Sequence, residues 1–90
     1  MNHLHEIVKV VALFNPDIKG KVQGMLPVKF NWRNRDYPVS EINLHYTELI
    51  EGVFNHIFLV LAGGSRIELH FNTKTLIWTL EQIEDSEESA

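Results

Sequence analysis

The sequence predicts an all-β protein, a single antiparallel sheet of about six strands that curls into a small barrel or sandwich. Two observations lead to this prediction. Short runs of alternating apolar and polar residues are separated by turn-forming residues. The strand pairings implied by consecutive turns also place their apolar side chains on one common face, which a sheet must bury against itself or a second layer.

The segment of residues 27–39 predicts a β-hairpin. Apolar and polar side chains alternate along it, which is the period of a half-buried strand. Asn34 and Arg35 are expected at the centre of a two-residue turn, because asparagine tolerates the positive φ that such turns require. The cross-strand pairs that follow from this turn are Trp32 with Tyr37, Phe30 with Val39, and Arg33 with Asp36.

The segments on either side of this hairpin are expected to extend the sheet. Residues 6–14 fit either a helical stripe or a strand, and their β-branched residues favour the strand. Residues 15–23 are expected to form an exposed connection, and residues 47–52 a polar one. After the hairpin the apolar positions change from odd to even numbers, which predicts a β-bulge near Ser40 and Glu41.

Residues 53–62 are the most apolar run of the chain and predict a central strand, with a short buried helix as the alternative. The two glycines that follow are expected to form a two-residue turn, and residues 72–75 a four-residue turn that pairs Phe71 with Leu76. Both turns place the same set of side chains on one face, and this agreement is the strongest indication of the fold. The predicted inner face consists of Phe58, Val60, Ile67, Leu69, Phe71, Leu76, Trp78 and Leu80.

The opposite face of these strands carries an apolar strip that is too large to be left exposed. Either residues 6–14 cover the strip or a partner chain does, so the strip is the candidate dimer face. Its members are Ile57, Leu59, Leu61 and Ile77. Residues 1–83 are expected to form a single β-domain, and residues 84–90 a disordered acidic tail without an apolar anchor.

Composition narrows the class of protein. The 90 residues are 44% hydrophobic, which suits one small globular domain, and they include no cysteine. No segment approaches the roughly 20 apolar residues of a membrane span, so a cytoplasmic protein without a membrane partner is expected. Four acids in the last seven residues account for the net charge of −4, and the rest of the chain is neutral.

The sequence offers few candidates for catalysis or metal binding. Glu68 and His70 share the outer face and could form an acid–base pair, although surface charge is the simpler interpretation. His45, His56 and His70 lie on different strands without the close spacing of metal ligands. His56 falls on the inner face, where a hydrogen-bonded core histidine is the simpler interpretation. We therefore expect a non-enzymatic protein with no metal and no cofactor.

The basic and aromatic residues of the hairpin are the best candidate for a partner-binding surface. Cations beside stacking aromatic rings are the arrangement that holds single-stranded nucleic acid. The alternative is that both rings belong to the core and that Arg33 pairs with Asp36, which a neutral domain without a basic field favours. The candidate residues are Lys29, Trp32, Arg33, Arg35 and Tyr37.

The hairpin also contains regularly spaced aromatic and basic residues in the motif Pro27-x-x-Phe30-x-Trp32-Arg33-x-Arg35-x-Tyr37. With residues 7–14 upstream and Trp78 downstream, this motif resembles a family of small, uncharacterised bacterial all-β proteins. The likeness covers roughly residues 7–83. Some members are thought to be encoded near DNA-repair polymerases, so the resemblance implies a protein-interaction or nucleic-acid accessory role. The sequence departs from a DNA-binding version of the family in having few basic residues and an acidic tail.

These features predict a non-catalytic protein-interaction module that forms a homodimer or binds a protein partner. Weak binding of single-stranded nucleic acid through the hairpin is the alternative function.

Overall fold

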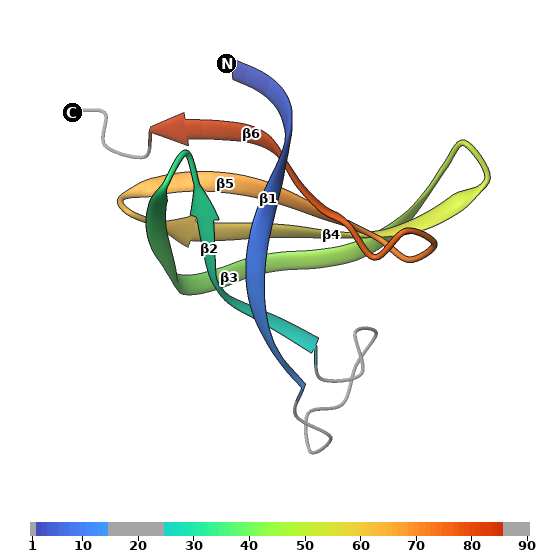
Figure 1. Ribbon diagram of the computed structural model, residues 1–90, viewed down its shortest axis with the longest axis horizontal. Helices are drawn as coiled ribbons and strands as arrows, with labels where there is room; N and C mark the ends of the chain where they lie inside the picture. Colours follow the sequence, from blue (N-terminus) through green and yellow to red (C-terminus); the bar gives the residue numbers. More distant parts are fainter. Residues whose placement is uncertain (1, 15–24, 86–90) are drawn as a thin grey trace.

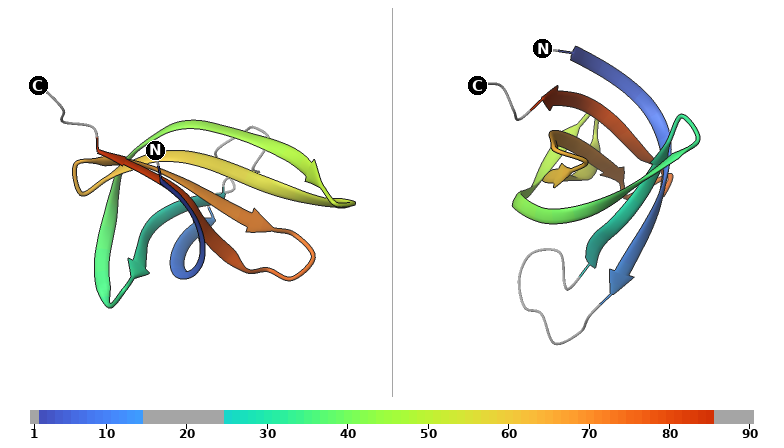
Figure 2. Two further views of the ribbon diagram at one scale, coloured as in Figure 1. Left: turned by 90° about the horizontal axis from the view of Figure 1, so that it is seen from above. Right: turned by 90° about the vertical axis from the view of Figure 1, so that its left-hand side faces the viewer.

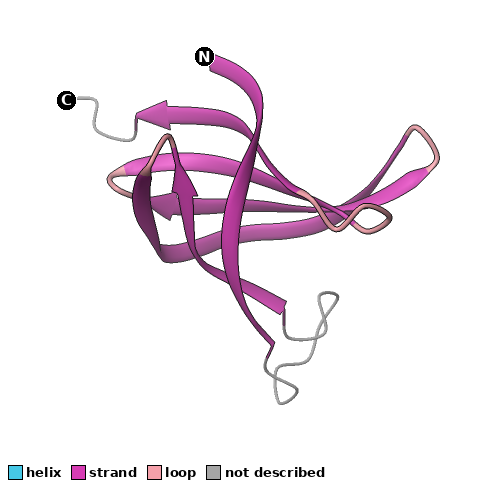
Figure 3. Ribbon diagram, in the orientation of Figure 1, coloured by secondary structure: helices cyan, strands magenta, loops and turns pink. Residues whose placement is uncertain are grey.

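A computed structural model describes residues 2–14 and 25–85, and its regular structure in these ranges is entirely β-strand (Figures 1 and 3). The six strands are β1 (Asn2–Phe14), β2 (Met25–Trp32), β3 (Arg35–Ile50), β4 (Val53–Ala62), β5 (Ser65–Asn72) and β6 (Trp78–Asp85). Each pairs antiparallel with the next, and β1 pairs with β6 to close a small barrel. The predicted fold class is confirmed, and so is the strand over residues 6–14. The expected connection at residues 15–23 lies outside the described residues.

The hairpin of β4 and β5 is built as the sequence predicts. Gly63 and Gly64 form its turn with φ values of 60° and 77°, a conformation that residues with a Cβ atom rarely adopt. The expected pairing of Phe58 with Leu69 is confirmed. Local turn chemistry therefore sets the register of this central pair of strands.

The turn between β2 and β3 begins one residue earlier than predicted. Arg33 and Asn34 form it, with φ values of 55° and 65°. Phe30 therefore lies opposite Tyr37, and the two rings stack with centroids 5.2 Å apart and planes 10° from parallel. A ring pair of this kind contributes roughly 0.5–1.5 kcal/mol beyond the area it buries, which favours this register. The predicted pairs Trp32–Tyr37, Phe30–Val39 and Arg33–Asp36 are wrong.

The connection between β5 and β6 is two residues longer than predicted. The side-chain Oδ1 of Asn72 accepts two backbone N–H groups of the connection at 2.8 and 2.9 Å, and its carbonyl accepts the N–H of Leu76 at 2.8 Å. Phe71 therefore pairs with Trp78 instead of Leu76, which is exposed. Because a shift of two residues preserves the side of the sheet, the remaining predicted core residues of β6 still face inward.

The third strand bends at two register shifts. One lies between Val39 and Glu41, which confirms the bulge predicted near Ser40, and the other lies between Ile42 and Leu44. β3 then continues through Ile50. The prediction of a polar connection over residues 47–52 is therefore wrong, except for the turn that follows Ile50. The bulges allow the strand to turn away from β2 and follow β4.

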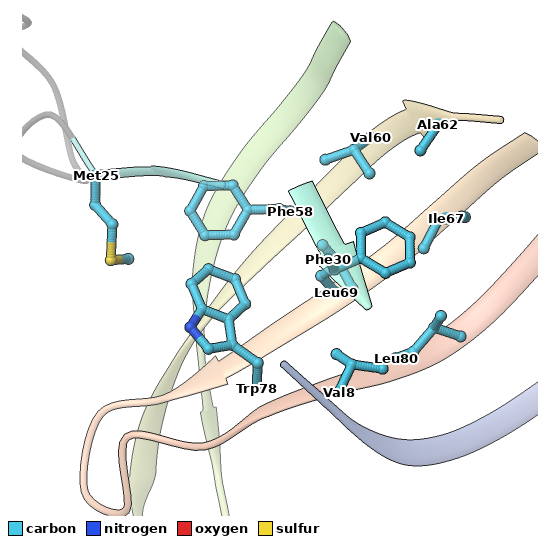
Figure 4. Packing of buried hydrophobic residues seen from close by; sticks show 10 residues of the cluster. All are labelled: Val8, Met25, Phe30, Phe58, Val60, Ala62, Ile67, Leu69, Trp78 and Leu80. Carbon is cyan, nitrogen blue, oxygen red and sulfur yellow. The ribbon is translucent and has the colours of Figure 1, made fainter. Parts of the chain in front are cut away.

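The core fills the barrel, and its buried side chains come from strands at both the beginning and the end of the chain. Figure 4 shows Phe30, Phe58 and Trp78, from β2, β4 and β6, pointing into one interior. The buried cluster is Val8, Met25, Phe30, Phe58, Val60, Ala62, Ile67, Leu69, Trp78 and Leu80. β6 extends through Asp85. Residues 84 and 85, which were predicted to begin a disordered acidic tail, therefore belong to this strand.

The seam between β2 and β3 opens part-way along the two strands. β2 and β3 share four paired positions, the last of which joins Lys29 to Pro38, and the two strands then diverge. The right-hand view of Figure 2 shows them separating from their common turn. The end of β3 and the beginning of β4 project away from the barrel as a two-stranded arm, residues 49–54, beside the β5–β6 connection (Figure 1).

Candidate functional site

The hairpin residues predicted to bind a partner lie together, but they bind one another and β1. The indole Nε1–H of Trp32 donates to Oε1 of Glu6 at 2.8 Å, and Arg33 Nη2 donates to Oε2 of the same carboxylate at 2.7 Å. The Arg33 guanidinium also lies 4.5 Å from the centre of the Trp32 ring. The hydrogen bond from Arg33, followed by that from Trp32, lowers the pKa of Glu6.

The other candidate hairpin residues are also engaged within the domain. Lys29 Nζ lies 3.9 Å from Oδ2 of Asp36, and the Arg35 guanidinium lies 5.8 Å from the centre of the Tyr37 ring. Tyr37 stacks in addition on Phe30. Because the protein's own groups contact both aromatic rings, this geometry gives no support to base stacking there. Binding of single-stranded nucleic acid stays a prediction.

The residues of the predicted dimer face do not form one exposed surface. Ile57 is fully buried, between its cross-strand neighbours Tyr46 and His70. Val8 and Val10 of β1 pack with the core, so they do not cover this face. Leu59 and Leu61 are half-buried, and Ile77 is exposed in the β5–β6 connection.

A groove of about 570 Å³ crosses the outer face of the sheet, lined in part by His5, Thr79 and Glu81. Register shifts in β1 and β6 place these residues together, and His5 has a φ of 56° there. Oε2 of the buried Glu81 lies 2.7 Å from Nδ1 of His5 and accepts the Thr79 hydroxyl at 2.7 Å. Burial raises the pKa of Glu81, but these two hydrogen bonds and the nearby imidazoles outweigh burial, and the net shift is downward.

The acid–base pair considered from the sequence is present in this region. Nε2 of His70 lies 2.5 Å from Oε2 of Glu68, and both side chains are largely buried. Burial, followed by the charge of Glu68, raises the pKa of Tyr46 on β3, which lies on the far side of β4 from β5. The His5–Glu81 pair joins β1 to β6, whereas Glu68 and His70 both lie on β5, and in each pair a carboxylate contacts an imidazole.

The edge of β3 that faces away from β4 is the largest unpaired feature of the described chain. β4 pairs with β3 as far as Ile50, whereas β2 pairs with it only as far as Pro38. Along residues 39–50, no described strand pairs with that second edge, which we call the open edge. Alternate N–H and C=O groups of a strand point to each of its edges, so this one presents donors and acceptors that no described strand pairs.

Exposed apolar side chains flank the open edge on both faces. Leu44 and Tyr46 are 50% and 39% exposed on the outer face. Leu49 and Phe54, a cross-strand pair on the inner face of the arm, are each 59% exposed. Exposed apolar surface beside an unpaired edge is typical of a site that binds another chain.

The charge of this region is one-sided. Residues 36–65 include no lysine or arginine, but they include Asp36, Glu41, Glu48 and Glu51. Glu41 and Glu48 are both exposed on the outer face of β3, on either side of Leu44 and Tyr46. The open edge is therefore an acidic and apolar surface, in contrast to the neutral average of the domain.

Comparison with known proteins gives no further guide to the site. No family model, no curated protein and no solved structure matches the chain. In the part of the chain that the structure describes, no group of three or more histidine, cysteine, aspartate or glutamate residues is placed to hold a metal ion. That part also contains no helix able to cross a membrane.

Sequence reasoning missed the open edge and the His5–Glu81 contact. The sequence contained one signal for the edge. Residues 39–50 lack glycine and proline, which favours one long strand, and in the structure β3 is much longer than its neighbour β2. The contact had no such signal, since it depends on two register shifts in strands at opposite ends of the chain.

Proposed function

We propose that the chain is a protein-interaction module that binds an extended, basic segment of a partner protein along the open edge of β3. The divergence of β2 and β3 after Pro38 is the observation that carries this proposal. A strand added at the edge would satisfy the backbone groups of residues 39–50 that no described strand pairs. Such pairing supplies affinity through the main chain and specificity through alternate side chains.

The side chains beside the edge define the partner's chemistry. Along the outer face of β3 the order is Glu41, Leu44, Tyr46 and Glu48. Opposite-charge and aromatic–aliphatic pairs across a ladder each contribute roughly 0.2–1 kcal/mol. The complementary strand therefore carries two apolar residues at alternate positions on this face, with a lysine or arginine on either side of them.

A basic partner fits the edge better than a second copy of the chain does. Pairing two β3 edges would bring the acids of both copies into one sheet, and like charges in register destabilise a ladder. Charged residues along an edge are also a common protection against self-pairing. A homodimer, which the sequence suggested, is thus the competing outcome of the experiment.

The experiment measures binding of two labelled peptides by fluorescence anisotropy. One peptide has the sequence Lys-Thr-Val-Thr-Val-Thr-Lys, and its matched control has glutamate in place of both lysines. We expect only the lysine peptide to bind, with an affinity that falls as salt is raised because the exposed charges are screened. The double variant Glu41→Lys/Glu48→Lys is expected to reverse the preference and bind the glutamate peptide.

The mass of the chain in solution is measured at the same concentrations by light scattering. A dimer that excludes the lysine peptide would mean that the edge is an interface between copies. A monomer that binds neither peptide, or a preference that the double variant leaves unchanged, would also overturn the proposal.

A further inference from the structure

Two histidines meet on the inner face where the arm leaves the barrel, away from the groove on the outer face. Nε2 of His45 in β3 lies 3.0 Å from Nδ1 of His56 in β4, and the ring centroids are 5.2 Å apart. Both side chains are half-buried, so solvent still reaches them. The ring of Phe58 lies 4.7 Å from that of His45, and the ring of Phe71 lies 6.3 Å from that of His56.

The distance between the two nitrogens matches the spacing of neighbouring ligands on a metal ion. Imidazole nitrogens bind such ions at about 2.0–2.1 Å, so two ligands lie about 2.9 Å apart at a right angle and about 3.3 Å apart at a tetrahedral angle. The observed 3.0 Å falls between these values. In the hydrogen bond the two nitrogens point toward each other, so each ring has to turn until its lone pair points at an ion beside the line that joins them.

We propose that His45 and His56 form a two-histidine site for a divalent first-row transition-metal ion, with Cu²⁺ bound most tightly. Cu²⁺ has the highest affinity of this series for nitrogen ligands, and its tetragonal geometry accepts two of them near a right angle. Since the described residues bring no third such ligand to the pair, water completes the coordination. The bound ion is therefore exchangeable and is not required for folding.

The proton balance of binding is simple. In the hydrogen-bonded pair one ring donates an N–H and the other accepts it, so one ring already presents a lone pair. The donor ring transfers its proton through solvent to its other nitrogen, a change of tautomer without change of charge. The metal ion then replaces the single shared hydrogen, and no net proton is released by the two rings.

The experiment uses Cu²⁺ and the full chain with His3→Gln, which removes an imidazole near the amino terminus that would compete for the ion. Substoichiometric Cu²⁺ is added to the isotope-labelled chain, and the paramagnetic broadening of side-chain resonances is recorded by NMR. We expect the first signals lost to be those of His45, His56, Phe58 and Phe71. Calorimetry should give one ion per chain.

Two glutamine variants test the ligands. His56→Gln keeps a polar side chain but removes the imidazole, and it should weaken Cu²⁺ binding by more than the roughly tenfold that loss of a mere outer-shell partner costs. His70→Gln, the matched control in the outer groove, should leave the affinity unchanged. Affinity that survives His56→Gln, or broadening centred on His5 and His70, would overturn the proposal. Should His56→Gln fail to fold, the broadening pattern of the parent chain decides alone.

Discussion

The two seams of the barrel are built in opposite ways. Where β1 meets β6, register shifts would weaken the ladder, yet side chains cross the seam and join it through His5 and Glu81. Where β2 meets β3, pairing stops at Pro38 and the strands diverge. The first seam joins the two ends of the sheet, and the second leaves an edge available.

The difference between the seams follows from where each bulge directs its strand. The shifts in β1 and β6 turn side chains toward one another, so the irregularity is compensated by hydrogen bonds. The shifts in β3 bend the strand toward β4, and the open edge is left without such bonds from any described strand. We infer that the closed seam serves stability, and the proposed binding site lies at the open one.

The largest effect is expected from two phenylalanines on the same face of β4. Phe58→Ala removes a fully buried ring that contacts Trp78 and should lower the free energy of unfolding by about 3–5 kcal/mol. Phe54→Ala, four residues earlier on the exposed arm, should change it by no more than about 0.5 kcal/mol. Urea denaturation of both variants measures the contrast, and equal losses would mean that the arm is part of the core.

The closed seam should weaken in acid. The folded pKa of Glu81 lies below its ordinary value of 4.5, so its ionised form stabilises the fold above about pH 4.5, and that stability is lost as pH falls toward the folded pKa. Glu81→Ala should lower the free energy of unfolding at pH 7 by about 1–3 kcal/mol, because Thr79 loses a buried hydrogen-bond partner.

Denaturation of the parent chain and the variant between pH 3 and pH 7 tests this effect. The difference in stability between the two chains should narrow as pH falls. A stability difference that stays constant between pH 3 and pH 7 would show that ionisation of Glu81 does not stabilise the closed seam.

The open edge should be sensitive to charge without being important for stability. Leu44→Lys places a cation on an exposed outer position of β3, and lysine on an edge discourages strand pairing. Binding of the lysine peptide should be lost, while the free energy of unfolding changes by less than about 0.5 kcal/mol. Ile7→Lys, at an exposed position of β1 on the closed seam, is the control and should bind as the parent chain does.

The smallest effect is expected at the Glu6 carboxylate, which joins the hairpin to β1. Glu6→Gln keeps an acceptor for the Trp32 indole but removes the charge that holds Arg33. The fold should persist, and the indole N–H resonance of Trp32 should move while resonances of the distant arm stay in place. Changes that spread to the arm would mean that the two seams are coupled.

The sequence by itself determined the all-β fold class, where the β4–β5 turn lies and which side chains of β4 and β5 face inward. These properties are local, because alternation sets the face and a glycine pair sets the turn. The same reasoning placed the β2–β3 turn one residue late, since the stacking of Phe30 on Tyr37 outweighed the preference expected for Asn34.

Only the tertiary structure decided how the barrel closes and where it stays open. The His5–Glu81 contact joins residues 76 positions apart in the sequence, and it exists because two bulges meet across the β1–β6 seam. The open edge likewise depends on the path of β3 relative to β2. Alternation assigns each side chain to a face of the sheet but does not say which neighbour, if any, lies along a strand's edge.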